Sequence, residues 1–137
     1  MITGLAHVCL LTPDLPATER FYCEGLGLAK QFEFIRAGRV FGFYLKVGPR
    51  NFIEVFETDA GVESADRFPI RHIAIEVDDL AATRQRLIDH GYTVTEPLLA
   101  GDNAWQAWVT DPAGVQIEFH HYTPEASQLT GAPCLCE

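Results

Sequence analysis

The chain has 137 residues, which is enough for one compact domain or two small half-domains. Hydrophobic residues make up 47% and charged residues 21%, as in an ordinary soluble globular protein. The formal net charge of −9 argues against a nucleic-acid or anionic-membrane partner, since both require a basic surface. No apolar run approaches membrane-spanning length and the N-terminus lacks a basic-then-apolar leader, so we expect a cytoplasmic protein.

The first half of the chain is predicted to form one strand, one helix and three further strands. Residues 5–11 alternate as in a strand, and Asp14 is a suitable N-cap for a helix through about Glu24. Three strand-like stretches follow, separated by turns that contain glycine: 30–35, 40–47 and 51–57. Residues 58–69 are polar, contain Gly and Pro, and indicate a linker, so the first module covers residues 1–57.

The same order of elements restarts after the linker. Residues 70–77 are predicted to form a strand, and Asp79 can cap a helix that ends before Gly91. Three strand-like stretches complete this second module, which covers residues 70–122: 93–98, 105–110 and 115–122. Residues 111–114 (Asp-Pro-Ala-Gly) give a strong hairpin signal between the last two strands. Residues 123–137 are expected to be a C-terminal tail, and the role of Cys134 and Cys136 within it stays open.

One histidine and one glutamate recur in each half. His7 and His72 lie in similar phrases, GLAHVCLLTPDL and PIRHIAIEVDDL, and Glu54 and Glu118 each interrupt an apolar strand. A carboxylate inside such a strand is costly unless it is paired or bound to a metal. The separation of the two histidines along the chain nearly equals that of the two glutamates. The duplication therefore predicts one four-ligand metal site shared between the modules: His7, Glu54, His72 and Glu118.

The chemistry of these four side chains limits the metal without fixing it. Two neutral imidazoles and two carboxylates suit a divalent ion of Zn, Ni, Co, Mn or Fe. A lone strand histidine is more often structural than a ligand, and a lone glutamate often faces solvent. The repetition of both pairs in register is what favours the metal site, and a binding protein with a degenerate or empty site is the alternative.

The pattern resembles the vicinal oxygen chelate superfamily, which includes glyoxalase I, extradiol dioxygenases, and the fosfomycin and bleomycin resistance proteins. The resemblance spans residues 2–122 and rests on the stretches GLAHVCLLTPDL, FYCEGLGL, NFIEVFE, RHIAIEVDDL and DPAGVQIEF. It implies one domain of α+β fold in which two βαβββ modules form a curved mixed sheet with a metal-binding cup. It also places the superfamily's ligand positions at the four side chains named above, and implies a small-molecule substrate and a homodimer.

Glu54 is the position that separates the activities of this superfamily. A second glutamate on the fourth strand resembles glyoxalase I, so we expect a metal-dependent lyase or isomerase that chelates a small vicinal-oxygen substrate. Glu118 and Glu54 would transfer a proton through an enediolate-type intermediate. Bacterial glyoxalase I commonly carries Arg and Asn where this chain has Leu11 and Thr58, so glutathione dependence is not expected.

Two alternative functions stay open at this point. An extradiol-type dioxygenase would need only His7, His72 and Glu118 as ligands of iron. A non-catalytic drug- or metabolite-binding protein, of the kind that confers resistance, would need only an aromatic cup. Neither alternative requires Glu54 to move a proton.

Four further side chains are predicted to contact substrate: Phe52, Phe56, Trp105 and His120. Phe52 and Phe56 share a strand face with Glu54. A tight turn at 111–114 would pair Trp105 with His120 and Ala107 with Glu118, which brings Trp105 and His120 into the cup; a bulge at the turn would bring in Trp108 instead. His120 could also donate a proton to the ligand two residues before it.

Overall fold

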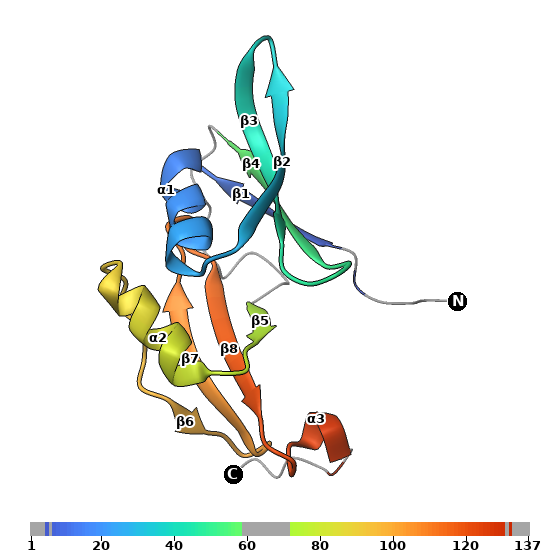
Figure 1. Ribbon diagram of the computed structural model, residues 1–137, viewed down its shortest axis with the longest axis vertical. Coiled ribbons are helices and arrows are strands. Elements are labelled where there is room, and N and C mark those ends of the chain that lie inside the picture. Colours follow the sequence, from blue (N-terminus) through green and yellow to red (C-terminus); the bar gives the residue numbers. More distant parts are fainter. Residues whose placement is uncertain (1–4, 6, 59–71, 131, 133–137) are drawn as a thin grey trace. The chain divides into compact units, whose positions relative to one another are not determined.

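A computed structural model describes residues 5, 7–58, 72–130 and 132. The chain divides into two compact units, residues 1–67 with 112–114 and residues 68–111 with 115–137. Each unit contains one four-stranded mixed sheet (Figure 1). Apart from Thr58, the predicted linker 58–69 lies outside the described residues, and the exact module boundaries stay a prediction. No helix in the described part of the chain is long and apolar enough to cross a membrane.

The sheet of the first unit has the strand order β1-β4-β3-β2, in which β1 runs parallel to β4 and the other neighbours are antiparallel. Its strands are β1 (His7–Thr12), β2 (Ala29–Arg36), β3 (Arg39–Lys46) and β4 (Phe52–Glu57). Between β1 and β2 the predicted helix begins as α1 (Leu15–Glu19) and continues as a turn of wider π-helix, η1 (Arg20–Gly25). The prediction that Asp14 is the N-cap is confirmed, because its Oδ1 accepts a hydrogen bond from the Ala17 amide at 2.9 Å.

One face of this first sheet is closed and the other is open. Apolar side chains of β3 and β4 are fully buried together with two aromatic residues of η1: Phe43, Leu45, Ile53, Val55, Phe21 and Tyr22. Each of these side chains contributes about 1.5–3 kcal/mol by leaving water. Because successive strand residues point to opposite sides, the residues between them face the open side. His7, Tyr44 and Glu54 are among these open-face residues.

The second unit repeats the order of elements of the first. Its strands are β5 (Ile73–Glu76), β6 (Leu98–Leu99), β7 (Ala104–Thr110) and β8 (Gln116–Tyr122), in the sheet order β5-β8-β7-β6 (Figure 1). Helix α2 (Leu80–Asp89) is capped by Asp79, whose Oδ1 accepts the Ala82 amide at 2.8 Å. Gly91 follows it with φ +87°, a conformation that glycine adopts without strain. The predicted α+β fold, with β-α-β-β-β order in each half, is therefore confirmed.

The predicted strand at 93–98 is wrong for most of its length, since only Leu98 and Leu99 pair with β7. Pro97 has no amide hydrogen to donate to a sheet. The Thr95 carbonyl accepts from the Arg84 guanidinium at 2.9 Å, and the Thr95 hydroxyl accepts the Trp108 amide at 2.9 Å. The Thr95 amide still donates to the Trp108 carbonyl at 3.0 Å, but side chains take up these two other hydrogen bonds that a longer strand would have made through its backbone. The predicted tail likewise contains a short helix, α3 (Ser127–Thr130).

The pairing of β7 with β8 differs by one residue from the predicted tight turn. Thr110 pairs with Gln116, so the connection has an odd number of residues. The Asp111 side chain closes it by accepting the Val115 amide at 2.7 Å. Shifting a strand by one residue moves every side chain to the other face. The prediction that Trp105 pairs with His120 and Ala107 with Glu118 is therefore wrong.

The observed register places Trp108 opposite Glu118 and Trp105 opposite His121. Trp108 therefore shares the open face of the second sheet with Glu118, as the alternative with a bulged turn predicted. Trp105 lies on the opposite face, where 40% of it is exposed, so the expectation that it shares a face with Glu118 is wrong. Contact of Trp105 with a substrate stays a prediction.

Candidate metal centre

The first half brings together one of the two predicted ligand pairs. Parallel pairing of β1 with β4 sets Cys9 opposite Glu54, and His7 lies two residues earlier on the same face. His7 Nε2 lies 3.7 Å from Glu54 Oε2. The His7 side chain is 41% exposed and that of Glu54 is 17% exposed, so a solute can approach the pair from the open face.

Two protic side chains flank this pair. The Tyr44 hydroxyl lies 2.9 Å from His7 Nδ1, and the Cys9 thiol hydrogen-bonds to Glu54. Burial, and then the neighbouring Glu54 carboxylate, raises the pKa of Cys9 to about 11. Partial removal from water, then the charges of Glu54 and Cys9, also raises the pKa of Tyr44. Both groups stay protonated at neutral pH. The Glu54 carboxylate, a smaller cause of both shifts than removal from water, would attract a cation to the same place.

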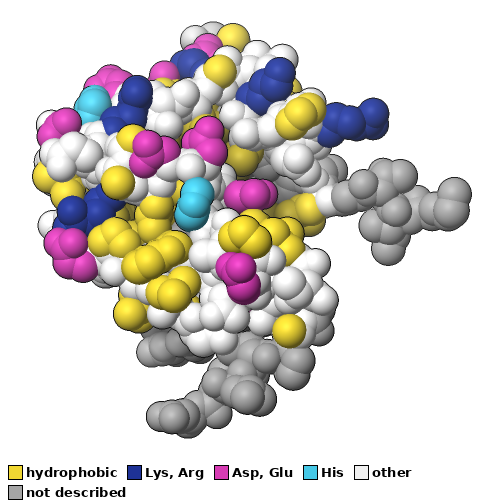
Figure 2. All heavy atoms as spheres, turned by 60° about the horizontal axis from the view of Figure 1, so that its bottom comes forward, with side chains coloured by type: hydrophobic (Ala, Val, Ile, Leu, Met, Phe, Trp, Pro, Cys, Tyr) yellow, Lys and Arg dark blue, Asp and Glu magenta, His cyan; other side chains and the backbone are white. Residues whose placement is uncertain are grey.

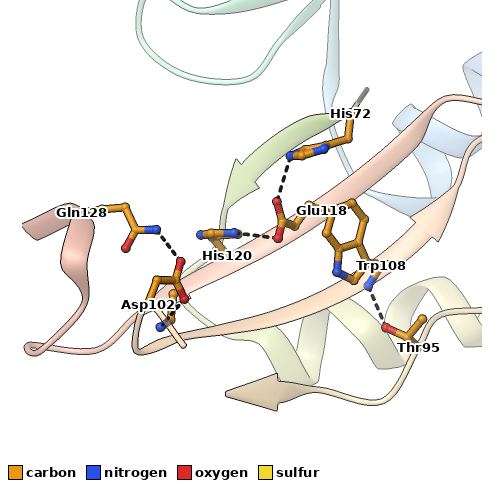
Figure 3. A network of polar contacts seen from close by, with 8 residues as sticks. His72, Thr95, Asp102, Trp108, Glu118, His120 and Gln128 are labelled. Carbon is orange, nitrogen blue, oxygen red and sulfur yellow. Dashed lines mark hydrogen bonds and ion pairs between the residues drawn. The ribbon is translucent and has the colours of Figure 1, made fainter. Parts of the chain in front are cut away.

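The second half brings together the other predicted pair (Figure 3). His72 Nε2 lies 3.2 Å from Glu118 Oε2, and His120 Nε2 lies 2.9 Å from Glu118 Oε1. Glu118 and His120 are both buried, whereas the His72 side chain is 40% exposed. The carboxylate of Glu118 therefore has one imidazole at each oxygen.

His120 is an unusual buried residue. Its Nε2 approaches Glu118 without the alignment of a hydrogen bond, and among the described residues neither ring nitrogen has a hydrogen-bond partner. Beyond it lies Asp102, which accepts a hydrogen bond from Gln128 of α3 at 2.6 Å (Figure 3). That hydrogen bond, followed by the Ala104 amide and the charge of His120, lowers the pKa of Asp102. Only 7% of His120 is exposed, and its Nε2 contacts Glu118. Binding of a substrate by His120 stays a prediction.

An aromatic wall adjoins the first pair on the open face of β2, β3 and β4. Phe52 packs against Tyr44 with ring centroids 5.5 Å apart, and Phe56 packs against Phe34 at 4.7 Å. Phe52 and Phe56 thus share a face with Glu54, as the alternation predicted. Figure 2 shows one face of the molecule, on which exposed hydrophobic side chains lie among acidic, basic and histidine side chains. Contact of Phe52 and Phe56 with a substrate stays a prediction.

Sequence reasoning missed Tyr44. The antiparallel pairing of β3 with β4 sets Tyr44 directly opposite Glu54, in the way that Trp108 stands opposite Glu118. The signal was available in principle, because the register of a hairpin fixes which residues face each other. The loop between β3 and β4, with Pro49 and Asn51, has no single standard length that would have fixed that register.

The donor types in each half fit a divalent metal. Each half supplies one imidazole nitrogen and one carboxylate oxygen that face each other, which is the borderline nitrogen and oxygen set that Zn, Ni, Co, Mn and Fe accept. Within the described residues no group of three or more His, Cys, Asp or Glu is arranged to hold a metal ion. Convergence of His7, Glu54, His72 and Glu118 on one ion therefore stays a prediction.

Comparison with known proteins connects these halves to a large family. The family model described as Glyoxalase/Bleomycin resistance protein/Dioxygenase superfamily matches residues 4–119. The solved structure of SMU.1112c is 27% identical, with a TM-score of 0.75 over 88% of this chain and 99% of that one. A comparison with curated proteins finds no match.

Two further solved structures share the fold at lower identity. Lactoylglutathione lyase from Agrobacterium tumefaciens is 21% identical, with a TM-score of 0.66 over 88% of this chain and 94% of that one. TnmS3, an antibiotic binding protein from Streptomyces sp. CB03234, is 18% identical, with a TM-score of 0.70 over 89% of this chain and 98% of that one. At these identities the likeness concerns the fold alone.

Proposed function

Because the chain belongs to the Glyoxalase/Bleomycin resistance protein/Dioxygenase superfamily, we propose that it is a metal-dependent lyase or isomerase of glyoxalase type. Its substrate is a small molecule with two adjacent oxygen atoms, one of them a carbonyl. The observation that carries the proposal is the pair of one histidine and one glutamate on the open face of each sheet. A homodimer and a cytoplasmic location, expected from the sequence, remain part of this proposal.

The four predicted ligands would hold one divalent ion: His7, Glu54, His72 and Glu118. Such an ion polarises a bound carbonyl and stabilises negative charge that develops on it, which is worth several kcal/mol. The residues near it would keep the imidazoles in place, since Tyr44 contacts His7 and Trp108 contacts His72. These donor types do not select one ion among Zn, Ni, Co, Mn and Fe, because other contacts to the ion also decide its identity.

Glu54 and Glu118 are the groups that would move the proton next to the carbonyl, a contribution of roughly 10²–10⁴-fold in rate. Their surroundings differ. Glu118 is buried with an imidazole at each oxygen, whereas Glu54 is more exposed and has the Cys9 thiol and a more distant imidazole beside it. The looser environment makes Glu54 the carboxylate that reaches the substrate, and the tighter one makes Glu118 the fixed ligand.

The surroundings of the site support a substrate other than a glutathione adduct. Leu11 shares the open face with His7 and is 54% exposed, so this strand end offers no charged or polar contact to a peptide carboxylate. Phe52 and Phe56 instead line the neighbouring surface with half-buried rings. A compact substrate with an apolar part suits such a wall better than a charged tripeptide does.

One observation favours a second candidate function. The aromatic wall would also hold a drug or metabolite without any reaction, and an antibiotic binding protein is among the structures of similar fold. The extradiol-type dioxygenase, with His7, His72 and Glu118 as ligands, has no comparable support, because it assigns no role to Glu54 beside His7.

Metal analysis of the purified protein, followed by Glu54→Gln, separates these functions. A panel of small 2-hydroxy and 2-oxo carbonyl compounds in D₂O, followed by NMR, reports exchange of the proton next to the carbonyl. We expect about one divalent ion per chain in the wild type, with exchange largely lost and metal binding only modestly weakened in Glu54→Gln. Glu57→Gln is the matched control, because Glu57 lies on the same strand and pairs with Arg39.

Unchanged exchange in Glu54→Gln would contradict the assigned role of Glu54. Oxygen consumption with iron-loaded protein and a catechol would instead support the dioxygenase. Absence of stoichiometric metal, together with tight binding of an aromatic compound, would support the non-catalytic binder.

A further inference from the structure

Tyr44 and Trp108 occupy equivalent positions in the two halves. Tyr44 of β3 pairs with Glu54 of β4, and Trp108 of β7 pairs with Glu118 of β8. Each aromatic ring also contacts the histidine of its own half. The Tyr44 and His7 ring centroids lie 5.6 Å apart, and those of Trp108 and His72 lie 5.0 Å apart. Each half therefore carries one aromatic side chain, on β3 or β7, that contacts the candidate histidine ligand of that half.

The two aromatic residues differ in what they can offer an imidazole. The Tyr44 hydroxyl lies 2.9 Å from His7 Nδ1, and a phenol oxygen can accept a hydrogen bond as well as donate one. An indole has an N–H donor and no acceptor, so Trp108 cannot accept a hydrogen bond from His72, and the observed contact between them is edge-to-face ring packing. The duplicated halves are thus asymmetric at this point.

The two ring nitrogens of His7 have different surroundings. Nδ1 faces the Tyr44 oxygen at hydrogen-bond distance, and the phenol can donate to Nδ1 or accept from it. His7 Nε2 faces Glu54 Oε2 at 3.7 Å, which is too long for a hydrogen bond between them. Nδ1 therefore has a fixed partner, and Nε2 is the nitrogen left to bind a cation beside the carboxylate.

The Tyr44 hydroxyl is itself held in place by packing. Phe32 stacks on the Tyr44 ring with centroids 4.6 Å apart and planes 17° apart, and Phe52 packs against it at 5.5 Å. A ring fixed on two sides presents its oxygen in one direction, because rotation about χ1 would break both contacts. Phe32 and Phe52 thereby orient the Tyr44 hydroxyl, which is the hydrogen-bond partner of His7 Nδ1.

We infer that Tyr44 is a positioning residue that holds His7 through a hydrogen bond at Nδ1, with Nε2 left to bind a cation, while His72 is oriented by packing against Trp108. The part of this inference that concerns metal binding rests on the proposed function. The part that concerns the hydrogen bond at Nδ1 is a property of the metal-free protein, and it can be measured without any metal.

The test compares Tyr44→Phe with Trp108→Phe. Tyr44→Phe removes one oxygen atom and keeps the ring that packs against Phe32 and Phe52, and Trp108→Phe keeps an aromatic ring against His72. The first readout is the ¹⁵N NMR spectrum of the histidine side chains in metal-free protein. We expect the Nδ1 signal of His7 to move in Tyr44→Phe, because its hydrogen-bond partner is lost, and to stay at the wild-type position in Trp108→Phe. An unchanged His7 Nδ1 signal in Tyr44→Phe would overturn the inference.

The second readout is the affinity for Zn²⁺ and for Ni²⁺, measured by competition with a chelator. Loss of a partner to the second ring nitrogen of a ligating histidine costs about 10–100-fold in metal affinity, so we expect a loss of that size in Tyr44→Phe. Trp108→Phe should lose less, because it removes no hydrogen bond to a ligand. Equal losses in the two variants would overturn the inference.

These two readouts separate failure of the inference from failure of the proposed function. If the wild type binds neither ion, the proposed metal dependence fails, and the NMR comparison still decides the role of Tyr44. If the wild type binds metal and Tyr44→Phe alters neither the His7 Nδ1 signal nor the metal affinity, the inference fails and the proposed function stands. Circular dichroism of both variants establishes that they fold.

Discussion

Gly42 of β3 leaves the space that Phe56 of β4 fills, and Gly42→Ala should show this directly. A Cβ atom at position 42 would lie 2.5 Å from Phe56 Cδ1 and 2.5 Å from the Val55 carbonyl oxygen. Real Cβ contacts are essentially never shorter than 3.0 Å, and one of the two neighbours is backbone that cannot rotate away. Either β3 and β4 separate locally or the Phe56 ring leaves its position in the aromatic wall.

The size of the effect follows from these contacts. Overpacking a well-packed site costs typically about 1–3 kcal/mol, and for a domain of this length about 1 kcal/mol lowers the melting temperature by roughly 3–5 °C. We therefore expect Gly42→Ala to melt about 5–10 °C below the wild type. Gly48→Ala is the matched control, since its Cβ would approach the Asn51 side chain alone, with the oxygen nearest at 3.1 Å.

Thermal unfolding by circular dichroism measures both variants. We expect the loss for Gly48→Ala to be clearly smaller, because a side-chain atom can give by a few tenths of an ångström. Gly42→Ala should also weaken binding of any ligand that contacts Phe56. A melting temperature for Gly42→Ala equal to that of the wild type would refute the packing argument for the aromatic wall.

Four further predictions concern the candidate site. Because the pKa of Cys9 is raised to about 11, its alkylation by iodoacetamide at pH 8, followed by peptide mass spectrometry, should be slower than that of a free thiol, and rapid labelling would contradict the shift. The unfolded thiol releases its proton at lower pH than the folded one, so folding stability should fall between about pH 9 and pH 11 in the wild type and less in Cys9→Ala. The methylglyoxal–glutathione hemithioacetal should be converted weakly or not at all, given Leu11 and Thr58, and efficient turnover would disprove this. Since Trp108 contacts His72 and Trp105 faces the other way, Ni²⁺ should quench the fluorescence of Trp105→Phe more than that of Trp108→Phe; the reverse order would count against the observed register.

Local rules predicted the elements that depend on neighbours in the sequence. Asp14 and Asp79 cap the helices as predicted, because an N-cap needs only a side-chain acceptor a few residues from the first amides. Gly91 likewise follows α2 with a positive φ. The alternation of strand residues also predicted that Phe52 and Phe56 share a face with Glu54.

Features that depend on distant residues were harder to predict. The strand expected at 93–98 fails because Arg84 of α2 takes the Thr95 carbonyl, a contact that no window around position 95 contains. The face of Trp105 depended on a single residue in the turn that follows β7. Tyr44 was missed because its place beside His7 requires the register of two strand pairings at once.

The most direct test of the central claim is the metal stoichiometry of the wild type, His7→Ala and His72→Ala, combined with X-ray absorption of the zinc-loaded wild type. We predict one ion per chain, bound by nitrogen and oxygen atoms at about 2.0–2.2 Å, and loss of binding in either variant. Binding that survives the removal of either histidine, or two ions per chain, would contradict a single centre shared by the two halves.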